Sequence, residues 1–208
     1  EVLQKRLTNV SILLYLPAMS KIKSNKNGTR KDVIISKAAR LFREKGYSAS
    51  SMRDLAEEVG VEAASLYNHI SSKSEILQEI CFKVANKFLS HIEAIDNSPI
   101  HSIAKIEAVL RFHVQQMINH YEEVYVSDRE WKHLVDPYMS NYQNQRRTYR
   151  QRMAQIIENG IQKGEIKSID APTAVLIMLH AVSGIESWHR SKKKISGELL
   201  EENMLMIL

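Results

Sequence analysis

The sequence is poor in residues that stop helices, with only seven glycines and four prolines among 208 residues. An all-β or α/β chain needs more turn signals than these, so both classes are disfavoured. The single cysteine, Cys81, excludes an intramolecular disulfide, and no Cys/His pair has the spacing of a structural zinc site. We therefore expect an all-α protein of the reducing cytoplasm, without a metal or a cofactor.

A membrane-spanning run is not found near the amino terminus either. The apolar stretch at residues 10–16 is far shorter than the roughly 20 residues that cross a bilayer. Lys5 and Arg6 precede it as in a signal peptide, but no convincing small-residue cleavage site follows. We expect residues 1–27 to form a flexible, basic extension, and we expect no membrane partner.

Positive charge is concentrated in the first third of the chain. Residues 1–74 contain 13 Lys and Arg against 7 Asp and Glu, whereas the remainder contains 16 against 17. Such an excess favours a polyanion such as DNA, because cationic side chains neutralise phosphates and release counterions. A solvated basic tail would give the same composition, so the pattern of residues must decide between them.

Helical periodicity organises this basic part. Apolar residues recur at helical spacing from residue 29 to 45. A second, short helix is capped by Ser50 or Ser51 and ended by Gly60, and a third begins near Glu62. The third helix follows the second with almost no gap.

A long helix is expected next, from about Lys73 to Ile95, where Asp-Asn-Ser-Pro breaks it. It is capped by one of the two serines before it. Ser127-x-x-Glu130 has the form of a capping box, and Asp170 precedes Ala-Pro as at a helix start. Further helices are expected at about 100–120, 128–135, 137–163, 171–190 and 197–208.

The junction of the second and third helices is typical of a helix-turn-helix. Ala56 is small where two helices would approach, and Gly60 permits a tight turn between Val59 and Val61. In this motif the first helix positions the second in the major groove of DNA, which is wide enough for a helix.

These residues resemble the TetR family of bacterial regulators over about residues 28–88. The first helix resembles the family in Ala38-Ala39-Arg40-Leu41-Phe42-x-x-x-Gly46-Tyr47, and the second in Ser51-Met52-Arg53-Asp54-Leu55-Ala56. The third does so in Gly60-Val61-Glu62-Ala63-Ala64-Ser65-Leu66-Tyr67-Asn68-His69, followed by Lys73. Ile70 departs from the phenylalanine of many members but is still apolar.

The resemblance implies a DNA-binding domain at 28–88, with the helix-turn-helix at 51–70, that binds double-stranded operator DNA. It implies that small and polar side chains face the bases, namely Ala63, Ala64, Ser65, Asn68 and His69. Tyr67 and Lys73 would contact phosphates, aided by the helix N-terminus at Ser51 and by Arg30. Because this helix offers no Arg or Gln, we expect readout through thymine methyl groups and DNA shape.

The remaining residues, 89–208, would then form an effector-binding and dimerisation domain. The resemblance implies a homodimer in which the helices at about 171–190 and 197–208 form a four-helix bundle across a two-fold axis. One side of the first of these helices mixes small and large residues suited to close packing, namely Ala174, Met178, Ala181, Ile185 and Trp188.

An effector cavity is expected among the helices at 100–120, 128–135 and 137–163. Its candidate residues are His113, Met117, His120, Trp131, Tyr142, Arg146 and Tyr149. Aromatic and Met residues at helical spacing are also typical of an ordinary core, so both interpretations stay open.

Several segments of this part resemble a branch of the TetR family associated with lipid metabolism, some of whose members sense acyl-CoA thioesters. They are Glu130-Trp131-Lys132-His133-Leu134, Tyr142-x-x-x-Arg146-Arg147-x-Tyr149, Gly160-Ile161-Gln162-Lys163-Gly164-Glu165 and Trp188-His189-Arg190. The cluster of Arg146, Arg147, Arg150 and Arg152 would suit the anionic head group of a fatty acid or acyl-CoA, although charge runs on helices are often only solvated.

Two other classes of protein remain as alternatives to a ligand-responsive repressor. A histidine-dependent enzyme is suggested only by the eight histidines, because His113 and His120 are two turns apart and no phosphate-binding loop, G-x-S-x-G motif or cysteine nucleophile is recognisable. We therefore expect no catalytic activity. A non-catalytic helical interaction protein would be distinguished by DNA affinity that does not weaken with salt.

Overall fold

The computed structural model describes residues 29–192 and 195–208, which form helices joined by short turns, with no strand among them. The expected all-α fold is therefore confirmed, whereas the extension expected at residues 1–27 lies outside the described residues. The elements are α2 (Arg30–Lys45), α3 (Met52–Val59), α4 (Ala63–Leu66), α5 (Lys73–Asp96), α6 (Ser102–Asn119), α7 (Tyr121–Arg129), the 3-10 helix η2 (Trp131–His133), α8 (Tyr138–Gln162), α9 (Ala171–Ser183), α10 (Ile185–Arg190) and α11 (Gly197–Ile207).

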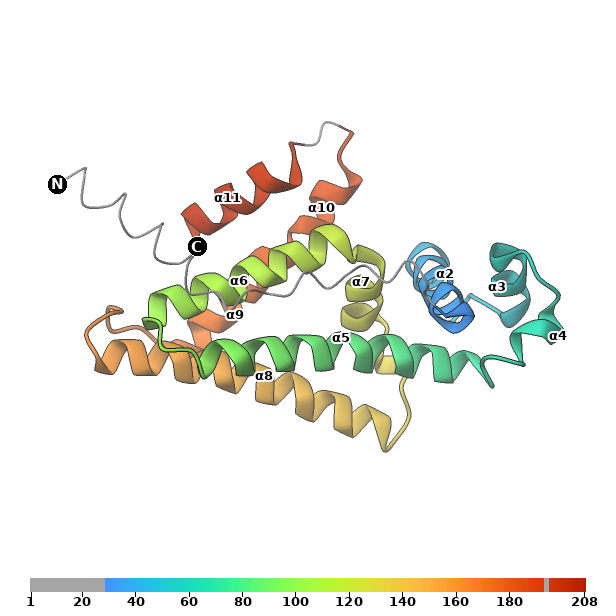
Figure 1. Cartoon of the computed structure of the whole chain (residues 1–208), viewed down its shortest axis with the longest axis horizontal. Coiled ribbons are helices and arrows are strands. Elements are labelled where there is room, and N and C mark those ends of the chain that lie inside the picture. Colours follow the sequence, from blue (N-terminus) through green and yellow to red (C-terminus); the bar gives the residue numbers. More distant parts are fainter. Residues whose placement is uncertain (1–28, 193–194) are drawn as a thin grey trace.

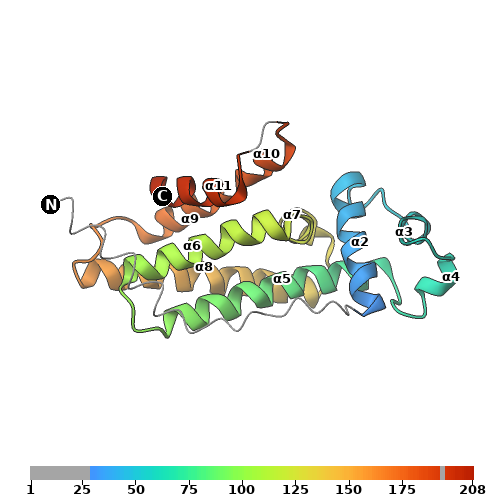
Figure 2. The same cartoon turned by 45° about the horizontal axis from the view of Figure 1, so that its top comes forward.

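The long helix α5 connects a small group of helices at one end, α2 to α4, with the larger group formed by α6 to α11 (Figure 1). α8 packs along α5, and α11 packs against the outer side of α6, as two views of the chain show (Figures 1 and 2). Among the residues described, no helix combines the length and the apolar character that crossing a membrane requires.

Local signals in the sequence place the helix ends. The hydroxyl of Ser51 accepts a hydrogen bond from the backbone of Asp54, whose carboxylate accepts one from the Ser51 backbone, so α3 begins with a capping box. α3 ends at Gly60, which has a φ of 80° that favours glycine. Ser72 caps α5 through the backbone of Glu75. Of the paired candidates, Ser51 and Ser72 are therefore the caps.

Two apolar cores lie along the molecule, and α5 contributes to both. The core at the α2–α4 end includes Phe42 and Leu66, and also takes in Leu134 and Tyr142 from the later elements. The second core is centred on residues of α5, α6, α8 and α9 such as Met153. Because η2 and α8 pack into the first core, a shift of either element acts directly on the small group of helices.

The prediction of a helix at 128–135 is wrong. The chain is already helical from Tyr121 to Arg129, and only the three residues of η2 follow. Ser127 does not cap a helix, because it is buried inside α7 and its hydroxyl lies 2.6 Å from that of Tyr142. The Ser-x-x-Glu pattern therefore reflects a tertiary hydrogen bond rather than a helix start.

The single helix expected at 171–190 is divided into α9 and α10 at Gly184. A side chain at Gly184 would lie 3.0 Å from the Ala181 carbonyl oxygen, so the close turn suits glycine. Ile185, expected on a dimer face, is instead buried within its own chain with 2% of its surface exposed. Asp170 does cap α9, as expected.

Candidate functional site

The junction of α3 and α4 has the geometry of a helix-turn-helix. The backbone N–H of Val61 donates to the Ala56 carbonyl at 3.0 Å, which closes the turn around Gly60. Leu66 and Ile70 anchor the second helix to the core with 0% and 1% of their surfaces exposed. The departure at Ile70 thus keeps the packing position filled.

The residues predicted to contact DNA lie largely on the outer surface. Ala64, Tyr67, Asn68 and His69 are exposed, as are Ser51 and Arg30, while Ala63 and Ser65 are half-buried. The helix α4 is only four residues long, so Tyr67, Asn68 and His69 lie in the turn that follows it. The structure brings these side chains to one end of the molecule, and their contacts with DNA stay a prediction.

Lys73 has a structural role that the sequence did not indicate. Its ammonium donates hydrogen bonds to the carbonyl oxygens of Tyr47 at 2.8 Å and Ser50 at 2.7 Å, and lies 4.3 Å from the centre of the Tyr47 ring. These contacts fix the start of α5 to the loop between α2 and α3. We infer that Lys73 holds the helix-turn-helix in place whether or not it also reaches a phosphate.

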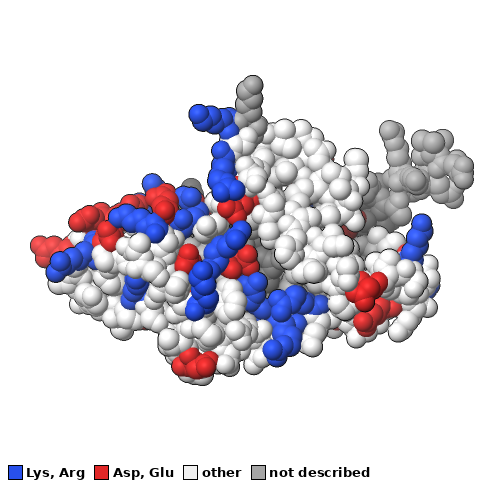
Figure 3. Space-filling view, turned by 180° about the vertical axis from the view of Figure 1, so that it is seen from behind, with Lys and Arg blue, Asp and Glu red and all other residues white. Residues whose placement is uncertain are grey.

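Charges at this end are more balanced than the composition suggests. Five of the 13 cationic residues counted to residue 74 precede Thr29, against one of the 7 acidic residues. Many of the others are paired, as in Lys37 with Glu58 at 3.2 Å and Lys45 with Asp54 at 2.8 Å. Figure 3 shows blue and red side chains interleaved over this end. Any electrostatic attraction to DNA therefore comes from particular cationic side chains and not from this end as a whole.

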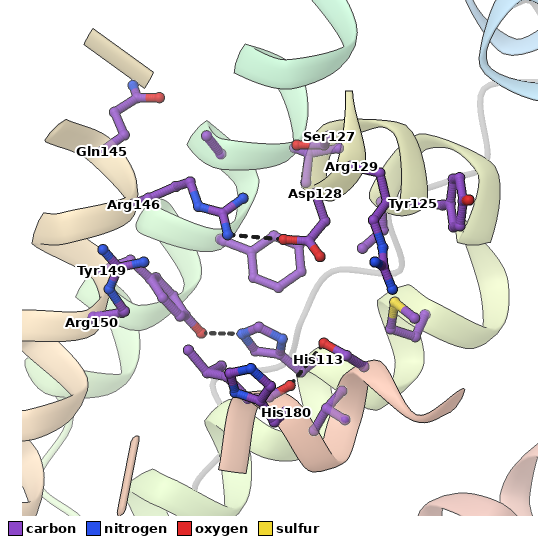
Figure 4. Close-up of a pocket in the computed structure, with 18 of the residues that line it drawn as sticks. His113, Tyr125, Ser127, Asp128, Arg129, Gln145, Arg146, Tyr149, Arg150 and His180 are labelled. Atoms are coloured by element: carbon purple, nitrogen blue, oxygen red, sulfur yellow. Dashed lines mark hydrogen bonds and ion pairs between the residues drawn. The ribbon is translucent and has the colours of Figure 1, made fainter. Parts of the chain in front are cut away.

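A cavity of about 300 Å³, partly open to solvent, lies in the larger group of helices and is lined mainly by α5, α6, α7, α8 and α9. Most of its wall is apolar, and the lining residues of this kind are Val84, Ala85, Phe88, Leu89, Met117, Val124, Leu176, Leu179 and Val182. Its volume is at the lower end of the range of small-ligand sites. Figure 4 shows the polar residues that line it.

Arginines from two helices line the cavity. The Arg146 guanidinium lies 2.9 Å from Asp128 Oδ1, and Arg129 lies 3.0 Å from Glu186 Oε2. Burial, and then the neighbouring Arg146 and Arg147, lower the pKa of Arg150. No carboxylate among the described residues forms an ion pair with Arg150. An anionic group placed here would relieve the repulsion among these guanidinium groups.

Two neutral polar side chains meet across the cavity. His113 Nε2 lies 2.7 Å from the Tyr149 hydroxyl oxygen, and Figure 4 marks this hydrogen bond. Burial, reinforced by the nearby His91, lowers the pKa of His113 to about 3. Burial also raises the pKa of Tyr149 above its ordinary value.

Five of the seven predicted effector residues line this cavity, namely His113, Met117, Tyr142, Arg146 and Tyr149. His120 does not, because it caps the end of α6 and is exposed. Trp131 does not either, because it packs on the first core, where the Arg146 guanidinium lies over its ring at 5.7 Å from the ring centre. The sequence missed the wall formed by α9, including His180, because that helix was assigned to dimerisation alone.

A second cavity of about 200 Å³ lies where α2 meets α7 and α10. Tyr125 and Glu186 line both cavities, and Arg43 of α2 lines the second. Tyr125 and Glu186 therefore form a wall between the two cavities, and the second cavity lies between this wall and α2. Within the described part of the chain, no group of three or more His, Cys, Asp or Glu residues has the arrangement of a metal site.

Relatives of the chain are transcriptional regulators by name. The HTH-type transcriptional repressor KstR2 of Rhodococcus jostii (strain RHA1) is 26% identical over 187 residues, which cover 89% of this chain and 91% of that protein. The biofilm operon icaADBC HTH-type negative transcriptional regulator IcaR of Staphylococcus aureus (strain Newman) is 26% identical over 162 residues, which cover 76% of this chain and 82% of that protein.

Solved structures share the fold. The ketosteroid transcriptional regulator KstR2 of Mycobacterium tuberculosis gives a TM-score of 0.80 at 20% identity, over 86% of this chain and 93% of that one. AibR in complex with isovaleryl coenzyme A and operator DNA gives 0.75 at 21% identity, over 86% and 98%.

Two family models match the chain in succession. The model described as "Bacterial regulatory proteins, tetR family" matches residues 34–80, around the helix-turn-helix. The model described as "Tetracyclin repressor-like, C-terminal domain" matches residues 100–208, which are more than half of the chain. The chain therefore belongs to the TetR family of helix-turn-helix transcriptional regulators.

Proposed function

We propose that this protein is a homodimeric repressor that binds operator DNA through α3 and α4 and responds to a small, hydrophobic, anionic effector, of which a fatty acid or an acyl-CoA is the best candidate. Relatives support the repressor role, since KstR2 and IcaR are named as repressors or negative regulators. AibR supports the ligand class, since its structure contains isovaleryl coenzyme A together with operator DNA.

The observation that carries the effector proposal is the combination of an apolar cavity with guanidinium groups in its wall. Apolar side chains from four helices suit a hydrocarbon group, whose burial contributes about 25 cal/mol per Å². Arg146 and Arg150 suit a carboxylate or a phosphate, because guanidinium groups bind both in a bidentate manner. The cavity is therefore suited to a ligand that is an amphipathic acid.

The size of the cavity limits what it encloses. A volume of about 300 Å³ accommodates a short or medium acyl group but not an entire acyl-CoA. The nucleotide of a CoA thioester would therefore remain outside, near the arginines. We expect short and medium acyl groups to bind better than long ones.

Homodimer formation is supported by apolar side chains that no other part of the described chain covers. On α9, Ile177 is 59% exposed, and on α11, Leu199 and Ile207 are 45% and 82% exposed. Patches of this kind mark interaction surfaces in soluble proteins. A two-fold axis would bring the same residues together from both chains.

The test is a titration of the purified protein on DNA from around its own coding region, in a series of salt concentrations. Selective binding that weakens with salt and is lost in Tyr67→Ala with Asn68→Ala supports the regulator, and salt-independent binding would favour the interaction-protein alternative. Adding isovaleryl-, octanoyl- or oleoyl-CoA, or octanoate, should then change the DNA affinity. If none of them does, the effector class is wrong although the repressor role stands.

A further inference from the structure

One hydrogen-bonded pair interrupts the apolar wall of the cavity. His113 belongs to α6 and Tyr149 to α8, and the imidazole and the hydroxyl point toward each other in Figure 4. The Phe88 ring lies 4.4 Å from the imidazole, measured between ring centroids, and Met117 lines the cavity beside them. The pair is therefore a polar feature in apolar surroundings.

The arrangement of protons in this pair follows from its contacts. Both side chains are neutral near pH 7, because burial lowers the pKa of His113 and raises that of Tyr149. Among the described residues, the Tyr149 hydroxyl has no acceptor other than His113 Nε2. Donation from this hydroxyl to Nε2 leaves only one polar atom of the pair without a partner, the N–H at Nδ1, whereas the reverse bond would leave both the hydroxyl proton and the bare Nδ1 without one. We therefore assign the single N–H of the neutral imidazole to Nδ1.

That N–H is unpaired within the described structure. No described residue accepts a hydrogen bond from His113 Nδ1, although the ring lines the cavity and retains accessible surface inside the helical bundle. Enclosing such a donor against pure hydrocarbon is unfavourable, because a buried donor without an acceptor loses its contact with water. A ligand with an acceptor at this point would avoid that loss.

We propose that the effector carries a carbonyl group on its acyl skeleton, apart from its carboxylate or thioester, and that His113 Nδ1–H donates a hydrogen bond to this oxygen. The inference rests on the proposed function, because it assigns the chemistry of the ligand in the same cavity. Arg146 and Arg150 lie on α8 within one turn of Tyr149, so the carbonyl lies near the anionic end. The ligand class is a keto-substituted acyl acid or its thioester.

Two probes of matched shape test this without DNA or a head group, namely cyclooctanone and cyclooctane. Their binding to the full chain, labelled with ¹⁵N-histidine, is followed by NMR of the imidazole nitrogens. Cyclooctanone should bind at least about five-fold more tightly than cyclooctane and should shift the Nδ1 resonance of His113. His91 provides an internal control, because its ring stacks on Phe112 and does not line the cavity.

The variant His113→Phe should bind both probes equally. If this variant does not fold, the labelled wild-type resonances still decide. Equal binding of the two probes by the wild type, ketone binding without a shift at His113, or no ketone binding up to the solubility limit would each overturn the inference. A failure of all acyl-CoAs to affect DNA binding would instead overturn the proposed effector class, so the two failures are distinguishable.

Discussion

The imidazole of His133 stacks on the phenol ring of Tyr47, with 5.1 Å between the ring centroids and 25° between the planes. His133 belongs to η2, as does Trp131, whose ring lies 5.7 Å from the Arg146 guanidinium at the cavity. Tyr47 lies in the loop between α2 and α3, where the Lys73 ammonium contacts it. The stack therefore joins the neighbourhood of the larger cavity to the helix-turn-helix.

Loss of this stack should weaken the response to effector more than DNA binding itself. Aromatic pairs contribute about 0.5–1.5 kcal/mol beyond the area that they bury. In His133→Ala, the change in operator affinity caused by octanoyl-CoA should therefore be smaller by about three- to ten-fold, as measured by fluorescence anisotropy. His101→Ala, an exposed histidine at the start of α6, is the control. An unchanged response in His133→Ala would show that coupling takes another route.

Tyr67→Phe should lower DNA affinity without lowering stability. The side chain is 54% exposed, so the ring makes little contribution to the core, while its hydroxyl is available for a phosphate. Loss of one such hydrogen bond predicts affinity about three- to ten-fold weaker, with an unchanged midpoint of thermal unfolding. Tyr138→Phe, which removes the hydroxyl of another exposed tyrosine, should leave both unchanged. Full affinity in Tyr67→Phe would mean that the hydroxyl does not contact DNA.

Arg150→Gln should weaken binding of octanoyl-CoA while leaving DNA affinity in the absence of ligand intact. The guanidinium lines the cavity without an acidic partner among the described residues, so its removal leaves no carboxylate unpaired. We expect roughly five- to ten-fold weaker binding by calorimetry, as for the loss of a charge-assisted hydrogen bond near solvent. Arg147→Gln, on the same helix but outside the cavity wall, is the matched control. Equal losses in both variants would point to general electrostatics instead.

The helix-turn-helix could be predicted from sequence because its signals are local. Ser51 forms the capping box with Asp54, and Gly60 provides the positive φ of the turn, each within a few residues. The prediction that Ser127 caps a helix was wrong for the opposite reason, since its hydrogen-bond partner Tyr142 lies 15 residues away. Local spacing does not distinguish a capping serine from one that bonds across helices.

The cavity was only partly predictable for a related reason. Side chains at helical spacing, such as Met117 and Tyr149, look the same in a filled core and in a cavity wall. His113 was found by its place on the stripe, but its hydrogen bond to Tyr149 depends on how α6 packs on α8. The contribution of α9 also required the packed structure.

Two partly buried histidines should make stability depend on pH. Burial lowers the pKa of His91 to about 4, and burial together with His91 lowers that of His113 to about 3, from 6.5. The unfolded chain therefore takes up protons below about pH 6.5 that the folded protein does not. The free energy of unfolding should fall as the pH falls from about 7 to 4, by at most about 1 kcal/mol per pH unit for each histidine.

Urea unfolding at several pH values between neutral and mildly acidic measures this dependence. His113→Phe should flatten it, because phenylalanine binds no proton in either state. His69→Gln, which replaces an exposed histidine, should retain the wild-type slope. If His113→Phe keeps that slope, the proton uptake must come from other groups.

Ile177→Glu should convert the proposed dimer into a monomer. Ile177 is 59% exposed on α9 and does not line the cavity, so the change should not affect the fold or the effector site. In a two-fold interface the substitution would place two carboxylates in an apolar contact, which is costly unless they are paired.

Val135→Glu, at a residue 61% exposed between η2 and α8, is the control. Sedimentation should give the mass of one chain for Ile177→Glu and of two for Val135→Glu. An Ile177→Glu protein that remains a dimer would place the interface elsewhere. If the variant is monomeric yet binds its operator as tightly as the wild type, DNA recognition does not depend on the two-fold assembly.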